Sequence, residues 1–271
     1  MLLRRQFGKL RLREADREAM RRAGRFNAQL MDFIRPHVKA GTTTGEIDKL
    51  VHDYTCDHGH RPAPLGYPGE KSPYPKSCCT SVNEVICHGI PGRYRLKSGD
   101  IVNVDVTSVV DGWHGDQSET FIIGKPSAEA REVTQCAFDS LYQAIDTIKP
   151  GSPISAIGDA IVGEAKKYGF GVVEKYVGHG LGRRFHQKPN IPHVATPASR
   201  RQRLEPGICF TIEPMINAGT KESIGDPHDG WTVRTKDGKL TAQFEHTILM
   251  TEKGPEILTL TEKGPQRGHK F

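Results

Sequence analysis

Two segments with helical periodicity open the chain. Between residues 13 and 35, apolar and small side chains recur along one helical face, and Pro36 ends the pattern. Residues 43–59 predict a second helix, because the threonine at its start and Glu46 form a capping box and the segment closes on a glycine. Residues 61–76 are rich in proline and glycine, so they predict a loop.

Residues 101–121 predict two strands around a turn. Apolar and polar side chains alternate, which is typical of a half-buried strand, and an Asp-Gly pair at 111–112 marks the turn. If the chain folds back between residues 110 and 111, Asp105 lies directly opposite Asp116 on one face. Because two such carboxylates repel each other, we expect one or two divalent cations beside them. A solvent-exposed turn with two unrelated acids is the simpler alternative.

The second half of the chain repeats this plan. One helix is predicted from residue 126 and a shorter one ends at Gly169. A shift of 110 residues places residues 39–42 on 149–152 and Gly59 on Gly169. This is a weak but ordered internal repeat, with coincidence of common turn residues as the alternative.

The repeat requires a second hairpin, and the sequence provides one. Residues 208–216 and 240–250 alternate as strands and carry Glu213 and Glu245. We therefore predict an α+β fold of two pseudo-twofold-related halves, with helices packed outside a curved antiparallel sheet. The halves would cover about residues 13–125 and 126–260, within a single domain that spans residues 13–271.

Composition indicates a globular protein of a reducing compartment. The 271 residues are 36% hydrophobic and 7% aromatic, and the sequence contains no apolar run as long as a membrane span. Residues 1–5 lack the apolar core of a secretory signal. The six cysteines include no C-x-x-C pair, which favours unpaired thiols in the cytoplasm.

The net charge of +6 lies entirely in the first 25 residues, which hold nine bases and three acids. A basic arm at residues 1–12 can contact nucleic acid, and ribosomal RNA is one candidate. We favour a solvated face of the first helix, because Phe7 is the only aromatic residue in this segment.

Four carboxylates that converge on one place require metal, and one histidine has a suitable context. His179 stands between glycines, which allow the backbone to approach an ion closely. Oxygen ligands with one imidazole suit Mn²⁺, Fe²⁺, Co²⁺ or Zn²⁺. Two other histidines lie on the metal strands: His246 should face away from Glu245, and His114 should pair across with Thr107 on the Asp105 face.

Short motifs around these residues are specific for one family. They are NEVICHGIP at 83–91, NVDVT at 103–107, HGD at 114–116, GHG at 178–180, FH at 185–186, FTIEPM at 210–215 and FEHT at 244–247. Through them, residues 13–260 resemble type I methionine aminopeptidases, which have the pita-bread fold. The resemblance implies removal of the N-terminal methionine from new proteins by two-metal hydrolysis, favoured when the second residue is small.

Carried over residue by residue, the resemblance implies two divalent ions, which could be Co, Mn, Fe, Zn or Ni. Asp116 and Glu245 would contact both, Asp105 one, and His179 and Glu213 the other. Glu213 would also move the proton of the attacking water. The resemblance further implies that His88 and His186 are catalytic residues beside the substrate and are not ligands. It also implies a monovalent cation near Asn83 and Val85.

The methionine pocket implied by the resemblance is aromatic, with a thiol that suits a thioether. Two features depart from the family pattern: the loop 67–74 is longer than usual, and Pro64 replaces a small or sulfur-bearing residue. Pocket residues are expected to be Tyr67, Tyr74, Cys79, His88, Phe185, His186 and Trp231.

Two alternatives remain open. A proline-specific peptidase of the same fold is one, although those enzymes are usually longer and the motif at 83–91 favours the methionine branch. A catalytically inactive module that binds RNA or ribosomes is the other, but such proteins lose metal ligands. We expect a monomer that acts on peptide or nascent-chain N-termini and does not bind membranes.

Overall fold

The computed structural model describes residues 11–271. The expected basic arm, residues 1–12, falls almost entirely outside the described residues, so its contact with ribosomal RNA stays a prediction. At its end, the backbone nitrogen of Leu12 donates to the carbonyl of Gly207 at 2.7 Å. The arm therefore joins the folded body at this point.

The long helices form where periodicity predicted them. The capping box is present, with Thr43 and Glu46 each accepting a hydrogen bond from the other's backbone nitrogen. The helix at residues 155–168 ends at Gly169, whose φ of 71° lies in the left-handed region that favours glycine. The helices are α2 (Glu14–Ile34), the 3-10 helix η1 (Arg35–His37), α3 (Thr44–Asp57), α4 (Ala128–Thr147), α5 (Ser155–Tyr168) and α6 (Pro197–Arg201).

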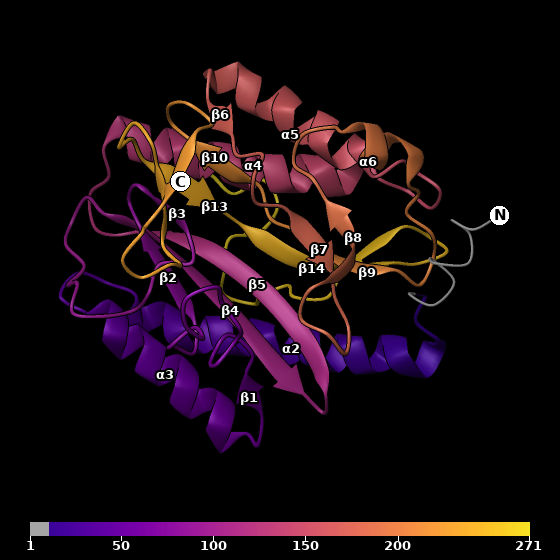
Figure 1. The fold of residues 1–271 in the computed structure, drawn as a ribbon, viewed down its shortest axis with the longest axis horizontal. Helices are drawn as coiled ribbons and strands as arrows, with labels where there is room; N and C mark the ends of the chain where they lie inside the picture. Colours follow the sequence, from indigo (N-terminus) through magenta and orange to yellow (C-terminus); the bar gives the residue numbers. More distant parts are fainter. Residues whose placement is uncertain (1–10) are drawn as a thin grey trace.

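A curved antiparallel sheet lies between the two helix pairs, with α2 and α3 on one side and α4 and α5 on the other (Figure 1). Nine strands form it in the described part of the chain, in the order β1-β4-β5-β14-β9-β7-β8, while β2 pairs with β4 and β15 with β14. This confirms the predicted α+β architecture. Its strands are β1 (Arg61–Pro62), β2 (Cys79–Val82), β4 (Ile101–Val110), β5 (Trp113–Ile122), β7 (Gly178–Gly180), β8 (Gln187–Ile191), β9 (Cys209–Ile212), β14 (Glu245–Met250) and β15 (Pro255–Ile257).

Two small sheets of three strands complete the fold. One has the order β13-β10-β6 and lies within the second half of the chain, and the other has the order β11-β12-β3 and joins β3 of the first half to two strands of the second. Their strands are β3 (Val85–Cys87), β6 (Gly171–Val172), β10 (Met215–Asn217), β11 (Ser223–Gly225), β12 (Val233–Thr235) and β13 (Thr241–Gln243).

The register predicted for the first hairpin is wrong. Asp111 and Gly112 form the two-residue turn, with φ of 50° and 79°, and the strands close on the pair Val110 and Trp113. Asp116 therefore pairs with Thr107 instead of Asp105, and His114 pairs with Val109. Since this slip is two residues, an even number, the side chains keep their predicted face.

Strand β4 also differs from the half-buried strand that its alternation predicted. Val102, Val104 and Val106 are fully buried against α2 and α3. The polar face is buried as well, since Asn103 and Thr107 are only 5% and 2% exposed. An alternating strand with two buried faces indicates that the polar face lines an interior site.

The second hairpin is present in the predicted place. Strands β9 and β14 pair His246 with Ile212, and the register continues unchanged into the pairing of β10 with β13. Between these two ladders, the same register places Glu213 opposite Glu245. Here the expectation of an opposed acidic pair holds more closely than in the first hairpin.

Backbone conformation recurs at the spacing of the internal repeat. Gly41 and Gly151 have φ of 92° and 85°, and Gly59 and Gly169 have φ of 74° and 71°. Helices α3 and α5 both contain 14 residues. These features agree with the repeat, while the boundaries of the two halves stay a prediction.

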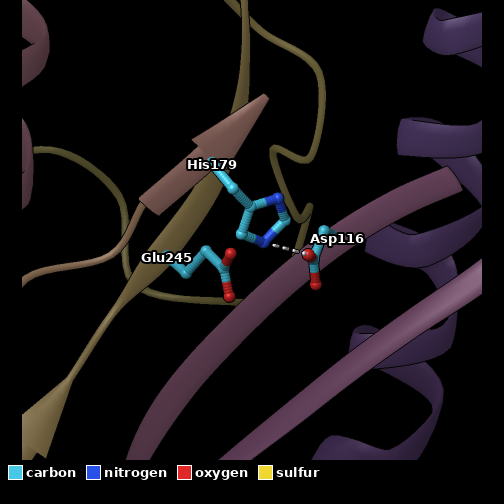
Figure 2. Close-up of side chains that lie close together, drawn as sticks. All are labelled: Asp116, His179 and Glu245. Atoms are coloured by element: carbon cyan, nitrogen blue, oxygen red, sulfur yellow. Dashed lines mark ion pairs between the residues drawn. The ribbon is translucent and has the colours of Figure 1, made fainter. Parts of the chain in front are cut away.

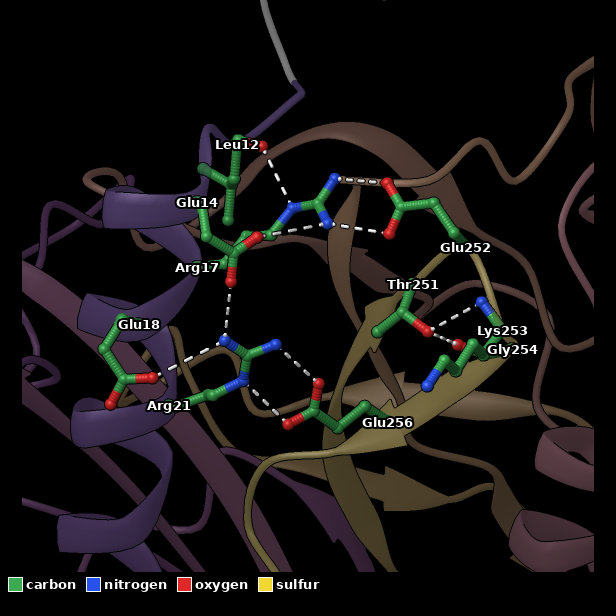
Figure 3. A network of polar contacts seen from close by, with 10 residues as sticks. All are labelled: Leu12, Glu14, Arg17, Glu18, Arg21, Thr251, Glu252, Lys253, Gly254 and Glu256. Carbon is green, nitrogen blue, oxygen red and sulfur yellow. Dashed lines mark hydrogen bonds and ion pairs between the residues drawn. The ribbon is translucent and has the colours of Figure 1, made fainter.

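Ion pairs tie the first helix to the end of the chain (Figure 3). Arg17 contacts both carboxylate oxygens of Glu252 at 2.9 Å, and Arg21 contacts Glu256 at 2.8 and 3.0 Å. Helix α2 itself carries four bases and four acids, so most of the basic excess of this region lies before it, in residues 1–13. Among the described residues, no helix is long and apolar enough to cross a membrane.

Candidate metal centre and substrate pocket

One pocket of about 330 Å³ contains every residue that the sequence predicted for the catalytic, metal-binding and methionine sites. It lies on the polar face of β4 and β5, where the two hairpins meet. The two residues named for a monovalent cation, Asn83 and Val85, line a separate cleft of about 210 Å³. The predicted residues in the pocket are Tyr67, Tyr74, Cys79, His88, Asp105, Asp116, His179, Phe185, His186, Glu213, Trp231 and Glu245.

Three of the five expected ligands form a tight group. Asp116 on β5, His179 on β7 and Glu245 on β14 each offer one ligand atom, and these atoms lie within 4.8 Å of one another. Figure 2 shows the three side chains pointing toward a common centre from three different strands. Asp105 and Glu213 line the same pocket beside this group.

The His179 ring is held in the orientation that metal binding requires. Its Nδ1 lies 3.1 Å from the carbonyl oxygen of Gly180, to which it can only donate. In the neutral ring Nε2 then carries the lone pair, and it lies 3.5 Å from Asp116 and 3.8 Å from Glu213. A backbone carbonyl that fixes the tautomer in this way is typical of a ligating histidine.

The acids are oriented by side chains that the sequence analysis missed. The Thr107 hydroxyl donates to Asp116 at 2.7 Å, and the Thr211 hydroxyl donates to Glu213 at 2.8 Å. Gln243 donates to the second oxygen of Glu213 at 3.2 Å. The alternation of side chains along a strand could have predicted the role of Thr211. It lies two residues from Glu213 and therefore on the same face.

The crowding of carboxylates is electrostatically unfavourable without cations. Burial, together with the charges of Asp116 and Glu213, raises the pKa of Asp105 well above its usual range, and the same causes act on Glu245. Burial also raises the pKa of Glu213, to about 7. Burial opposes protonation of His179, but the neighbouring Asp116 and Glu213 together raise its pKa.

This donor set fits divalent cations. Carboxylate oxygens and one imidazole nitrogen are ligands for Mn, Fe, Co and Zn, and cations would remove the repulsion that raises these pKa values. The three clustered ligand atoms are close enough together to contact one ion. The pocket thus provides a candidate metal site whose protein groups are already in place.

The two non-ligand histidines stand at the pocket wall. His88 has a φ of 57°, which is uncommon for a residue other than glycine and recurs at functional sites. The surrounding protein lowers its pKa to about 4. Nδ1 of His186 lies 2.7 Å from the Tyr67 hydroxyl, and its ring stacks on Phe185. Burial also lowers the pKa of His186, to about 3, so both rings are neutral near pH 7.

His246 and His114, the other two histidines on the metal strands, each lie on the predicted face of the sheet. His246 points away from Glu245, since its ring contacts Thr259 at 2.9 Å. His114 stays on the Asp116 face, where Nδ1 contacts the carbonyl of Gly182 at 2.9 Å. It does not line the metal pocket.

Aromatic side chains form two walls of the pocket. Tyr67 meets Phe185 edge-on at 5.3 Å between ring centroids, and Tyr74 meets Trp231 edge-on at 5.2 Å. Tyr74 is buried, and its hydroxyl lies within hydrogen-bond distance of two carbonyl acceptors, those of Cys78 at 3.1 Å and Gly89 at 3.0 Å. The longer loop reaches this second wall, because the Trp231 indole donates to the carbonyl of Ser72 at 3.1 Å.

Comparison with known proteins identifies the family. The model of metallopeptidase family M24 matches residues 18–252. The chain belongs to metallopeptidase family M24. Methionine aminopeptidase A of Synechocystis is 52% identical over 90% of this chain and 95% of its own. The solved structure of methionine aminopeptidase from Rickettsia prowazekii has a TM-score of 0.88 at 44% identity, covering 92% of this chain and 99% of its own.

These relatives confirm the expectation of a pita-bread, metal-dependent aminopeptidase. A more distant solved structure shares the fold alone. The prolidase from Pyrococcus horikoshii has a TM-score of 0.73 at 18% identity, covering 93% of this chain and 64% of its own. The pita-bread frame therefore supports more than one specificity, so the substrate has to be argued from the pocket.

Proposed function

We propose that this chain removes the N-terminal methionine from new proteins and peptides, with a preference for a small second residue. One observation carries the proposal: five candidate metal ligands and an aromatic pocket with a thiol occupy the same cavity. The close relatives that bear the name methionine aminopeptidase support the same assignment. We further propose that the enzyme is cytoplasmic and acts as a monomer.

Asp105, Asp116, His179, Glu213 and Glu245 would hold two divalent cations. When bound, these would act as Lewis acids toward the scissile carbonyl and its attacking water. Thr107 and Thr211 would keep Asp116 and Glu213 in a fixed orientation, since each hydroxyl donates to a carboxylate oxygen. The protein groups thus need little rearrangement to bind the ions.

Glu213 is our candidate for moving the proton. It lines the pocket beside the three clustered ligand atoms, so its carboxylate is placed to accept the proton of the attacking water and to release it later. Gln243 and Thr211 each bond one of its oxygens and so limit its motion. His186 and His88 are neutral and can donate one hydrogen bond each, to the developing oxyanion and near the amide nitrogen.

The pocket supports methionine as the first residue. Tyr74, Trp231 and Cys79 offer an apolar, polarisable surface that suits a thioether. Cys79 pairs directly with Asp105 across β2 and β4, so the side-chain pocket adjoins the metal site. A bulky second residue would meet His88 and His186, which favours a small one.

The test uses the full chain stripped of metal by a chelator and reloaded with single metals. Methionine release from Met-Ala-Ser should require added metal, and Met-Leu-Ser should react at least about tenfold more slowly. Asp105→Asn should abolish release and reduce the bound metal per chain. Arg131→Ser, on the exposed face of α4, is the control. Release of residues only before proline, with no methionine release, would instead support a proline-specific peptidase.

A further inference from the structure

A second cleft opens beside the mouth of the metal pocket. Its volume is about 370 Å³, and it shares Tyr67, Phe185 and His186 with the metal pocket. The hydrogen bond between Tyr67 and His186 thus lies at the boundary of the two spaces. The two spaces therefore adjoin at this pair of side chains.

The walls of the cleft are two loops near the opposite edges of the large sheet. One follows β1, and the other joins β7 to β8, while β1 and β8 end the main strand path. The second loop is held in place, because both the backbone nitrogen and Nδ1 of His114 contact the carbonyl of Gly182. The cleft is therefore part of the folded frame.

The cleft is strongly basic. Arg61, Arg183 and Arg184 line it, and no acidic side chain does. Among residues 11–271, none of the three lies within 4.0 Å of a carboxylate oxygen. The guanidinium of Arg183 lies 4.5 Å above the Trp113 ring, which fixes its position. The nearby Asp16 already accepts a hydrogen bond from Arg13 at 3.0 Å.

We propose that this arginine cleft, defined by Arg61, Arg183 and Arg184, binds the third to fifth residues of the substrate and favours acidic side chains there. The inference rests on the proposed function, because it assumes a peptide anchored by its first residue. An extended chain advances about 3.3 Å per residue, so a peptide that leaves the metal pocket past Tyr67 and His186 would place its third to fifth residues in the adjoining cleft. Guanidinium groups bind carboxylates in a planar, bidentate manner.

The exposure of these arginines sets the size of the effect. Exposed ion pairs are individually weak and are screened by salt. Several in one cleft increase the rate of productive encounter and lower KM, while kcat depends on groups in the metal pocket. We therefore expect a gain in kcat/KM of about three- to tenfold at low salt, with little change in kcat.

The experiment compares three peptides that share Met-Ala-Ser and end in Asp-Glu, Ser-Ser or Lys-Lys. All carry a C-terminal amide, so that no terminal carboxylate contributes. The metal-loaded full chain should cleave the acidic peptide with the highest kcat/KM at 20 mM salt, and the advantage should vanish at 0.5 M. Equal kcat/KM for the three at low salt would overturn the arginine cleft while leaving methionine release intact. No methionine release from any would overturn the proposed function itself.

Two variants locate the effect. Arg61→Gln combined with Arg184→Ser should reduce the ratio of acidic to neutral kcat/KM to about one, and Arg184→Glu should favour the basic peptide. Arg183 is kept because of its contact with Trp113. The control Arg131→Ser should keep the parent ratio. A parent ratio in both cleft variants, with parent-like melting temperatures, would overturn the proposal.

Discussion

The Tyr67 hydroxyl lies 2.7 Å from Nδ1 of His186 and connects the loop after β1 to the loop after β7. Since the two loops are separated by more than 100 residues, the bond is a long-range link across the pocket mouth. It leaves Nε2 of His186 as the nitrogen that remains available to a substrate.

Tyr67→Phe should reduce catalysis without unfolding the protein. The change removes only the hydroxyl, so the His186 ring loses its fixed orientation while Phe185 still stacks on it. We expect kcat/KM for Met-Ala-Ser to fall about tenfold and the bound metal to stay at the parent level. Steady-state kinetics and metal analysis check this. An unchanged kcat/KM would show that the hydroxyl does not position His186.

Thr211→Val should weaken metal binding. The Thr211 hydroxyl accepts from the backbone nitrogen of His179 at 3.0 Å and donates to Glu213 at 2.8 Å, so one group orients two proposed ligands. Loss of such a group typically reduces metal affinity about 10- to 100-fold. Titration of chelated metal into the variant measures this directly. Thr211→Ser keeps the hydroxyl and should restore most of the affinity; equal weakening in both variants would contradict the assigned role.

Much of the fold followed from local patterns. The capping box at Thr43, the closing glycine at Gly169 and the two hairpins all lie where the sequence placed them. Each depends on a local rule of backbone geometry that tertiary contacts did not override. The face of Asp105 and Asp116 was also predictable, because strand parity survives an even error in register.

The exact register of the first hairpin could not be predicted from spacing alone. The register depends on whether residues 111–112 form the whole turn. In the structure they do, since both have positive φ, as this type of two-residue turn requires. The cleft beside the pocket was also hidden, because Arg61 and Arg184 come from distant segments that only the curved sheet brings together. When exposed residues from distant segments come together in the fold, the pattern of hydrophobic and polar positions in the sequence does not reveal it.

Arg35→Met should strongly destabilise the protein. The guanidinium of Arg35 contacts both carboxylate oxygens of Glu119, which is only 6% exposed. Burial raises the pKa of Glu119, and Arg35 opposes that rise. Removing the arginine leaves an uncompensated buried acid, which costs about 3–5 kcal/mol. Urea unfolding measures the loss. The double variant Arg35→Met with Glu119→Leu should recover most of it; no recovery would mean that packing of Arg35, and not its charge, matters.

His193 should contribute to loss of stability in mild acid. Its ring is fully buried, and neither ring nitrogen has a hydrogen-bond partner among residues 11–271. Burial lowers its pKa to about 3. An unfolded chain binds the proton near pH 6.5, whereas the folded protein binds it only near pH 3, so the unfolded state takes up more protons between these values. Stability from this group is therefore complete above pH 6.5 and is lost as the pH falls toward 3.

His193→Phe tests this against the background of all other titrating groups. The parent should lose about 2 kcal/mol more unfolding free energy than the variant when the pH falls from 7.5 to 5, because 1.5 pH units lie below the unfolded pKa. Both proteins are measured by urea unfolding with metal removed, so that metal release does not contribute. A conservative His193→Gln variant should match the shallow pH dependence of His193→Phe, since it also lacks the imidazole. If parent and variants lost stability in parallel, the imidazole of His193 would have to be protonated or hydrogen-bonded in the folded protein.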